Sequence, residues 1–283
     1  MIQISRIGLA IAFSPTASAM LAEASHLVRH FHAQLILIHV GIRGGEEERR
    51  IYEMIGQTEL VTSEVLIVWK KGEPVKEILK ACKEEKIDLL LVGALKKENL
   101  VNHYLGTVAR KIVHKADCSV LMITNPTLES RPLKNIVVNA EDSPFVEPAI
   151  YAACHWSLPA PDVWIHIVRE LKLLGLALSA NAQRTEEEYL QSKQNMLAEE
   201  KKIVEKILQR IPHDNLKINI KMLSGKSGFE LARFAERKKA DLLILGAPRR
   251  KFSFFSRLFP HDQEYIFNEL PCNVLVVNPR KIS

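Results

Sequence analysis

The chain repeats itself, and this internal repeat constrains its fold more than any other feature. Near the start, RIGLAIAFSPTASAMLAEA aligns with KNIVVNAEDSPFVEPAIYAA, so that Ser14 falls on Ser143, 129 residues later. Further along, KIDLLLVGA aligns with KADLLILGA through Asp88 and Asp241, which lie 153 residues apart. Because the same elements recur in the same order, the sequence predicts two copies of one fold.

Two domains, 1–128 and 129–283, follow from this repeat, because a chain of 283 residues is long enough to bury two separate cores. The polar, proline-flanked segment 125–132 marks the joint between them. The second copy is 24 residues longer than the first. Its extra length contains 185–211, where Thr185 and three glutamates predict the start of a long amphipathic helix. The sequence assigns no role to this helix.

Short apolar runs alternate with helix-length amphipathic stretches in both copies. The predicted strands are 5–12, 34–40, 64–69, 88–93 and 119–124 in the first copy, and 134–140, 162–168, 216–222, 241–246 and 273–277 in the second. Helices are expected to begin near Ser18, Gly45, Pro74 and Thr107. Continuous runs such as LILIHV favour strands that are covered on both faces. The pattern predicts an α/β fold with two doubly wound, five-stranded parallel sheets.

Charge, hydropathy and cysteine usage limit the class of protein. The 39 Lys and Arg against 33 Asp and Glu give a net charge of +6, and most of this excess falls in 131–283, so an anionic partner is expected to favour the second copy. No apolar stretch approaches the roughly 20 residues of a membrane span, and no signal peptide pattern is visible. The four cysteines form no CxxC pair and suit buried thiols in a reducing compartment. We therefore expect a folded cytoplasmic protein.

The ordered set of motifs resembles the universal stress protein family in its tandem two-domain form. The resemblance rests on SPTASAMLAEA after the first strand, on VWKKGEPVKEILKACKEEKIDLLLVGA at 68–94 and on GTVARKIVHKADCSVLMIT at 106–124. The second copy repeats the last two of these motifs more loosely, as MLSGKSGFELARFAERKKADLLILGA and LPCNVLVV. The resemblance covers nearly the whole chain. It implies an adenine nucleotide alpha hydrolase-like fold and a non-catalytic role in binding and regulation during the stress response.

In one subgroup of that family, the resemblance also implies an ATP site at the carboxyl ends of the strands, where glycines let backbone N–H groups approach the phosphates. Its motif is Gly, two residues, Gly, nine residues, Gly, then Ser or Thr. Here Lys96 stands in place of the second glycine, and Ala12 replaces the aspartate that contacts the nucleoside. We therefore expect a degenerate site for ATP or AMP in the first copy. Its expected residues are Ala12, Val40, Gly93, Lys96, Gly106 and Thr107.

The second copy departs further from the motif. Gly246 is followed by Arg249 at the second glycine position, and Pro260 and His261 stand where glycine and Ser or Thr belong. Glu141 occupies the position of the first-strand aspartate. We expect Glu141, Gly246 and Arg249 to mark a degenerate second site, so that any nucleotide is confined to the first copy.

Several of these residues also have plainer interpretations. Thr107 can serve only as the N-cap of the helix that follows it, and Lys96 can be a solvated surface lysine. The SGKSG segment at 224–228 lacks the upstream glycine of a phosphate loop and indicates a strand-to-helix turn. His26 and His30 have a spacing that a metal can bridge, but no metalloenzyme motif accompanies them, so we predict helix-surface histidines and no metal.

The segment RRKFSFFSRLF at 249–259 concentrates cations and aromatic residues. Such a segment can bind single-stranded nucleic acid or an anionic membrane surface, or it can pack its phenylalanines inward and leave its arginines in water. We favour the inward packing and keep the segment as the most accessible surface for a partner. The alternative functions are therefore a nucleic-acid or anionic-surface binder acting through 249–259, and an enzyme that uses ATP.

The two copies are expected to pair with each other through their last strands, 120–123 and 274–277. Each is an apolar edge strand in this strand order, and an uncovered apolar edge invites pairing or aggregation. Covalent linkage raises the effective concentration of the second edge, which favours antiparallel pairing within one chain. The Asn-Pro pairs at 125–126 and 278–279 are expected to stop both strands at the same depth. The protein partner itself is left open by the sequence.

Overall fold

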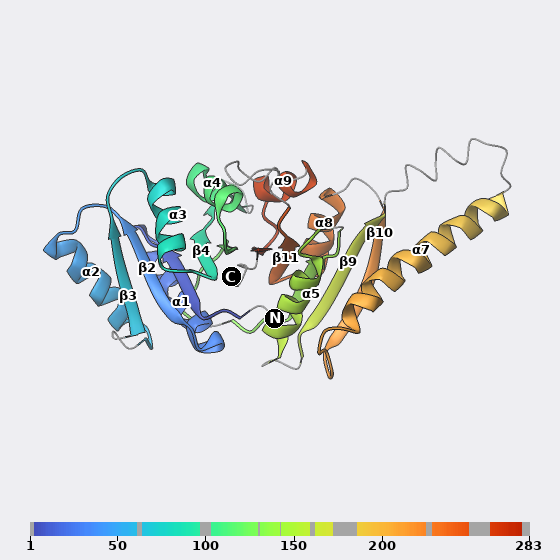
Figure 1. Cartoon of the computed structure of the whole chain (residues 1–283), viewed down its shortest axis with the longest axis horizontal. Helices are drawn as coiled ribbons and strands as arrows, with labels where there is room; N and C mark the ends of the chain where they lie inside the picture. Colours follow the sequence, from blue (N-terminus) through green and yellow to red (C-terminus); the bar gives the residue numbers. More distant parts are fainter. Residues whose placement is uncertain are drawn as a thin grey trace.

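The computed structural model describes residues 3–60, 64–96, 103–129, 131–141, 143–158, 162–171, 186–224, 228–248 and 261–278. Within these residues, ten strands form one sheet in the order β10-β9-β8-β11-β12-β7-β4-β1-β2-β3, with helices on both faces (Figure 1). The five strands of each copy are parallel to one another, and the two halves meet at β7 and β12. The predicted α/β class and the tandem arrangement are confirmed.

The first copy follows the predicted order of strands and helices. Its elements are β1 (Arg6–Ala10), α1 (Ala17–Phe31), β2 (Gln34–Val40), α2 (Gly45–Gly56), β3 (Val65–Lys70), α3 (Pro74–Glu84), β4 (Leu89–Gly93), β5 (Leu95–Lys96), β6 (His103–Tyr104), α4 (Thr107–Lys115) and β7 (Ser119–Ile123). The short strands β5 and β6 form a separate antiparallel pair between β4 and α4, which the sequence pattern did not predict.

The second copy repeats this order with a longer connection after its second strand. Its elements are β8 (Asn135–Asn139), α5 (Val146–Ser157), β9 (Trp164–Leu171), α7 (Glu186–Leu208), β10 (Lys217–Ser224), α8 (Phe229–Arg237), β11 (Leu242–Gly246), α9 (His261–Asn268) and β12 (Asn273–Val277). Figure 1 shows α7 at the outer end of the second copy, with its first turns projecting beyond the sheet. The expected long helix is therefore present, although Thr185 lies outside the described residues.

Antiparallel pairing of β7 with β12 joins the two copies as the sequence predicts. Leu275 pairs with Leu121 at the centre of this contact. Polar caps close both ends of it: Asn273 Oδ1 accepts from the Thr124 backbone N–H at 2.9 Å, and the Asn278 backbone N–H donates to Ser119 Oγ at 3.1 Å. The expectation that both Asn-Pro pairs stop the strands at the same depth is wrong by one residue. Asn278 directly follows β12, whereas Thr124 directly follows β7.

Two apolar layers cover the faces of the sheet, and each draws residues from both copies. Helices α1, α2, α5 and α7 cover one face, where Leu121 of β7 and Leu275 of β12 are buried together. Helices α3, α4, α8 and α9 cover the other face, where Val120 and Val276 are buried together. Because consecutive side chains of a strand point to opposite faces, strands buried on both faces read as continuous apolar runs.

The aspartates that revealed the repeat hold the starts of the first strands. Asp88 Oδ2 accepts from the backbone N–H groups of Ser5 and Arg6, both at 3.0 Å. Asp241 Oδ2 accepts in the same way from Lys134 at 2.7 Å and Asn135 at 2.9 Å. A carboxylate that accepts backbone N–H groups satisfies donors that no neighbouring strand reaches. The matched aspartates are therefore structural.

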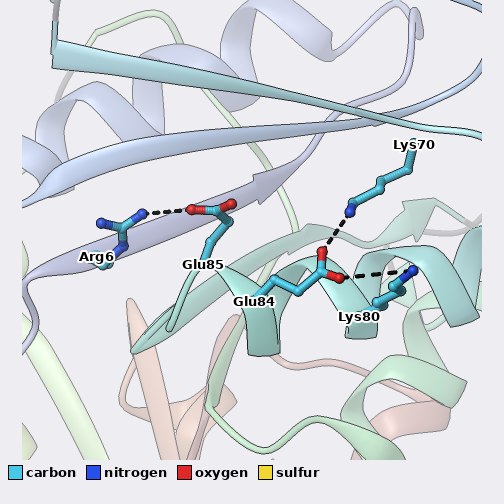
Figure 2. A network of polar contacts seen from close by, with 5 residues as sticks. All are labelled: Arg6, Lys70, Lys80, Glu84 and Glu85. Atoms are coloured by element: carbon cyan, nitrogen blue, oxygen red, sulfur yellow. Dashed lines mark hydrogen bonds and ion pairs between the residues drawn. The ribbon is translucent and has the colours of Figure 1, made fainter.

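Helix α3 is tied to the strands by ion pairs on either side of its C-terminal end (Figure 2). Arg6 of β1 contacts Glu85 at 2.9 Å, and Lys70 of β3 contacts Glu84 at 2.5 Å. Lys80 contacts the same Glu84 carboxylate at 3.8 Å. The hydrogen bond from Lys70 lowers the pKa of Glu84. Because these groups are partly exposed, the pairs add little stability but fix how α3 lies over the sheet.

The cysteines are free thiols. Cys82, Cys118 and Cys154 are buried as expected, whereas Cys272 is half-buried. Burial raises the pKa of Cys154 to about 11. Among the helices of the described residues, none is long and apolar enough to cross a membrane.

Candidate functional site

The expected residues of the first copy gather at one edge of its sheet, where parallel strands present their carboxyl ends. Gly93 ends β4 and is exposed. A Cβ added to Gly93 would meet only the Met20 side chain, with the nearest atom at 3.7 Å, so this position leaves room for a ligand. Gly106 begins α4 across the β5–β6 pair from Gly93. The edge therefore combines an accessible strand end with a helix start.

Gly106, not Thr107, is the N-cap of α4, which corrects the interpretation of Thr107 as a capping residue. Thr107 is the first helical residue, is exposed, and makes no capping hydrogen bond through its side chain. Neither α4 nor α1 has an acidic residue in its first turn or a side-chain cap. Both helix starts therefore direct their partial positive charge at this edge without an anionic side chain of the protein to neutralise it.

Lys96 lies on the short strand β5, opposite His103 of β6. Burial lowers the pKa of His103, and the nearby Lys96 ammonium lowers it further. Lys96 is exposed, so its charge is available at the edge of the site. The approach to Gly106 is narrower, because a Cβ there would lie 2.7 Å from the end of the Leu95 side chain. Leu95 is half exposed, and only the end of its side chain lies in this approach.

The end of this edge at which the sequence places a nucleoside is apolar. Ala12 follows β1 and Val40 ends β2, and the register of Ala10 opposite Ile38 brings these two positions side by side. Beneath them, the buried His39 hydrogen-bonds the Ile11 carbonyl through Nδ1 at 3.1 Å and contacts the Phe13 ring at 4.9 Å between centroids. This end can offer van der Waals contact to a flat ring, and Ala12 offers no side-chain acceptor for a ribose hydroxyl.

The matching edge of the second copy is closed by the protein itself. Gly246 is buried, and a Cβ there would lie 2.7 Å from Ser143 Oγ and 3.2 Å from the Phe145 backbone. Ser143 Oγ donates to the Ala247 carbonyl at 3.1 Å and accepts from the Phe145 backbone N–H at 3.1 Å. Ser143 therefore takes the space beside the strand end that stays open at Gly93.

The acidic side chains at this second edge serve the fold. Glu170, which follows the buried Arg169 in β9, accepts from the Gly228 backbone N–H at 3.0 Å and so occupies the start of α8. Arg169 donates to the Ala140 carbonyl at 2.7 Å and pairs with Glu200 of α7. Glu141 is half-buried at the end of this edge. The expected Arg249 lies outside the described residues, as does the basic and aromatic segment 249–259.

Sequence reasoning missed three residues that shape these edges: Ser143, His39 and Arg169. Only Arg169 carried a visible signal, since an arginine inside the apolar run WIHIVREL needs a buried partner. His26 and His30 lie on α1, half-buried beside the junction of the two copies. Within the described part of the chain, no group of His, Cys, Asp and Glu is arranged to hold a metal ion.

Comparison with known proteins identifies the family to which this chain is similar. The sequence model of the Universal stress protein family matches residues 42–124 and 134–278. A universal stress protein of Methanothermobacter thermautotrophicus is 39% identical over 57 residues, which are 20% of this chain and 38% of that relative. The aligned region therefore spans well under two thirds of that relative.

Solved structures match over the whole length. A universal stress protein of Archaeoglobus fulgidus superposes with a TM-score of 0.64 at 15% identity, covering 99% of this chain and 100% of that one. A structure described as a putative universal stress protein of Pseudomonas aeruginosa gives 0.63 at 17% identity, covering 98% and 94%. Two successive family matches over one continuous sheet lead to a single conclusion: the chain belongs to the universal stress protein family, in tandem form.

Proposed function

We propose that this tandem universal stress protein is a non-catalytic regulatory binding protein whose first copy holds an adenine nucleotide, ATP or AMP, weakly. The second copy, divided from the first near residue 129, binds no nucleotide in this proposal and supports the first through the shared sheet. The contrast between two equivalent glycines carries the proposal. Gly93 is exposed with open space beside it, whereas Gly246 is buried against Ser143.

The phosphates would lie between the starts of α1 and α4. The starts of these two helices favour anions, because neither has a side-chain cap or an acidic residue in its first turn and the helix dipole is positive there. Thr107 supplies a hydroxyl at the first helical position, and Lys96 supplies a positive charge from β5. Together these groups can neutralise part of a phosphate chain without a metal ligand from the protein.

Affinity would be limited by two features of the site. Lys96 stands where a glycine would let the backbone approach the phosphates, and the exposed Leu95 must move before a ligand reaches Gly106. Ala12 and Val40 offer apolar contact to the base but no hydrogen bond to the ribose from their side chains. A site that lacks such paired polar contacts loses both affinity and discrimination among nucleosides.

Isothermal titration calorimetry with ATP and AMP tests the proposal. We expect a single weak site in the wild-type protein, and we expect Gly106→Val to abolish it, because a β-branched side chain fills the approach to α4. Gly56→Val is the matched control, since Gly56 ends α2 and has nothing within 4 Å of an added Cβ. Thermal melting of both variants checks that the fold is intact.

Three outcomes would contradict the proposal. Nucleotide binding that survives Gly106→Val would place the site elsewhere, and equal loss in Gly56→Val would mean that the effect is on folding. Release of phosphate or transfer of adenylate by the wild-type protein, reduced by Gly106→Val, would show that the site is catalytic.

A further inference from the structure

A cavity of about 760 Å³ lies at the junction of the two copies, and we propose that it is a second binding site, for a neutral small molecule that has both apolar and hydrogen-bonding groups. It is lined from the first copy by α1, β7 and the connecting segment, and from the second by the end of α5 and the starts of β11 and β12. Its volume is in the range of pockets that enclose drug-sized ligands. This inference does not depend on nucleotide binding.

About half of the cavity wall is apolar. Leu27 of α1, Leu121 of β7 and Leu133 of the connecting segment face Trp156 and Leu242 of the second copy. Leu121 and Leu242 belong to the buried core, and Leu27 and Leu133 pack against it half-buried. A ligand that covers these side chains gains roughly 25 cal/mol for each Å² of apolar surface removed from water. Neither copy alone supplies such an enclosure.

Two of the carboxylates in the lining already have backbone partners. Glu23 Oε1 accepts from the Thr127 backbone N–H at 3.0 Å and from Thr127 Oγ at 3.2 Å. Asp241 Oδ2 accepts from the backbone N–H groups of Lys134 and Asn135 at 2.7 and 2.9 Å. These bonds fix both ends of the connecting segment beside the cavity. The two carboxylates therefore hold the cavity wall in place, and their backbone partners lower their need for a cation from the ligand.

The remaining polar lining favours a neutral ligand. The exposed charged residues of the lining, Arg131 and Glu236, are opposite in sign. Burial lowers the pKa of His30, and His155 and His32 lower it further, so His30 is uncharged near neutral pH. His26 and His30 can form hydrogen bonds with a carbonyl or hydroxyl of the ligand. A phosphate chain would be repelled by the carboxylates of Glu23, Glu236 and Asp241, which are part of the lining.

The cavity is separate from the proposed nucleotide site. Its α1 residues are Glu23, His26, Leu27 and His30, whereas the α1 residue beside Gly93 is Met20. Ala12, Gly93 and Gly106 are not part of its lining, although His103, which pairs with Lys96, borders the cavity from β6. Because the ligand would contact both copies, its binding would stabilise their association by an amount that grows with the logarithm of the ligand concentration above the Kd.

N-Phenyl-1-naphthylamine tests the proposal, because this neutral dye fluoresces strongly only in apolar surroundings. We expect saturable binding to the full chain, with energy transfer from Trp156 that is lost in Trp156→Phe. Leu27→Trp and Leu133→Trp each place an indole in the cavity and should weaken dye binding by about tenfold or more. Leu128→Trp is the matched control, since Leu128 lies exposed in the same connecting segment outside the lining.

The outcomes separate clearly. Loss of dye binding in either filled variant that retains the wild-type melting temperature, with wild-type binding in Leu128→Trp, supports the site. Non-saturable binding, or unchanged binding in both filled variants, overturns it. Displacement of the dye by excess ATP would show that the two sites are one. Tighter binding of the anionic analogue 8-anilinonaphthalene-1-sulfonate would overturn the neutral class of ligand.

Discussion

At the residue scale, the two copies arrange the same residue types differently at equivalent positions. Gly93 and Gly246 each end the fourth long strand of their copy, yet one faces open space and the other faces Ser143. Ser143 holds its place by two hydrogen bonds, to the Ala247 carbonyl and from the Phe145 N–H. Both copies carry a serine at this position, but only Ser143 lies against the strand end, whereas Ser14 Oγ lies 3.2 Å from Thr16 Oγ1.

We expect Gly246→Ala to destabilise the chain by about 1–3 kcal/mol, because the added methyl would overlap Ser143 Oγ and displace it from its hydrogen bonds. Gly93→Ala should change the free energy of unfolding by less than about 0.5 kcal/mol, since its surroundings are open. Urea unfolding of both variants measures the difference. Adding Ser143→Gly to Gly246→Ala should recover part of the loss, and equal stabilities of the two alanine variants would refute this account.

His166 makes stability depend on pH. It is buried in β9, stacks on Trp164 and meets the Phe234 ring edge-on. Burial lowers its pKa from the ordinary 6.5, and Lys238 lowers it further. Between that lowered pKa and 6.5 the unfolded chain binds more protons than the folded one, so stability is complete above 6.5 and falls as the pH drops through this window.

Replacing His166 with glutamine should therefore flatten the decline in stability on acidification. The measurement is the urea midpoint of wild type and His166→Gln at about pH 7.5 and about pH 5.5. His30 and His103 have pKa values lowered in the same direction, so the variant should keep part of the decline. An identical decline in both proteins would mean that His166 is not a source of the effect.

At the scale of elements, the strands and most helix starts were predictable because their signals are local. The run at 34–40 and the run at 273–277 match their strands residue for residue, and Pro74 begins α3 as expected. The sequence did not predict the β5–β6 pair, because strands of two residues are too short to show a hydrophobic periodicity. The closure of Gly246 and the cavity beside Leu121 depend on segments far apart in sequence, so the repeat predicted that the ends of β4 and β11 are equivalent but not that one is open and the other closed.

Helix α7 is attached to the sheet through Arg169, which stands where the first copy has His39. Arg169 in β9 is buried, donates to the Ala140 carbonyl and pairs with Glu200 of α7. In the first copy His39 bonds the matching Ile11 carbonyl, so both copies satisfy the same backbone group with different side chains. The longer arginine reaches past this carbonyl to α7, the longer counterpart of α2 in the first copy.

We expect Arg169→Met to destabilise the protein by about 2–4 kcal/mol, because it leaves the Ala140 carbonyl unpaired in the core and removes the partner of Glu200. Arg49→Met is the control: Arg49 pairs with Glu53 at 3.5 Å on the surface of α2, and its loss should cost less than about 0.5 kcal/mol. Chemical denaturation followed by circular dichroism compares them. Similar losses in both variants would show that Arg169 contributes no more than a surface pair.

At the scale of the whole molecule, the antiparallel contact of β7 with β12 has two consequences. Because the two sets of parallel strands run in opposite directions, their carboxyl ends lie on opposite sides of the sheet. The open strand end at Gly93 and the filled strand end at Gly246 therefore face away from each other. The contact also merges two cores, since each apolar layer contains residues of both copies. Arg110 of α4 adds a bond to Glu264 of α9 at 3.0 Å.

A shared sheet and shared cores predict that the two copies unfold together. The three tryptophans allow a direct measurement, because Trp69 lies in β3 of the first copy and Trp164 in β9 of the second. Variants that retain only Trp69 or only Trp164 should give coincident urea transitions by fluorescence. Separate midpoints would mean that the contact between β7 and β12 does not couple the copies.

A substitution far from the junction gives the sharper measurement. Ile165 is fully buried in β9, and Ile165→Ala should cost about 2–5 kcal/mol in the core of the second copy. If the copies unfold as one unit, the Trp69 midpoint falls as well, although Trp69 lies at the far edge of the sheet from β9. Leu35→Ala in β2 should act in reverse and lower the Trp164 midpoint. An unchanged Trp69 midpoint in Ile165→Ala would show instead that each copy folds independently, because then the lost packing energy would stay within the second copy.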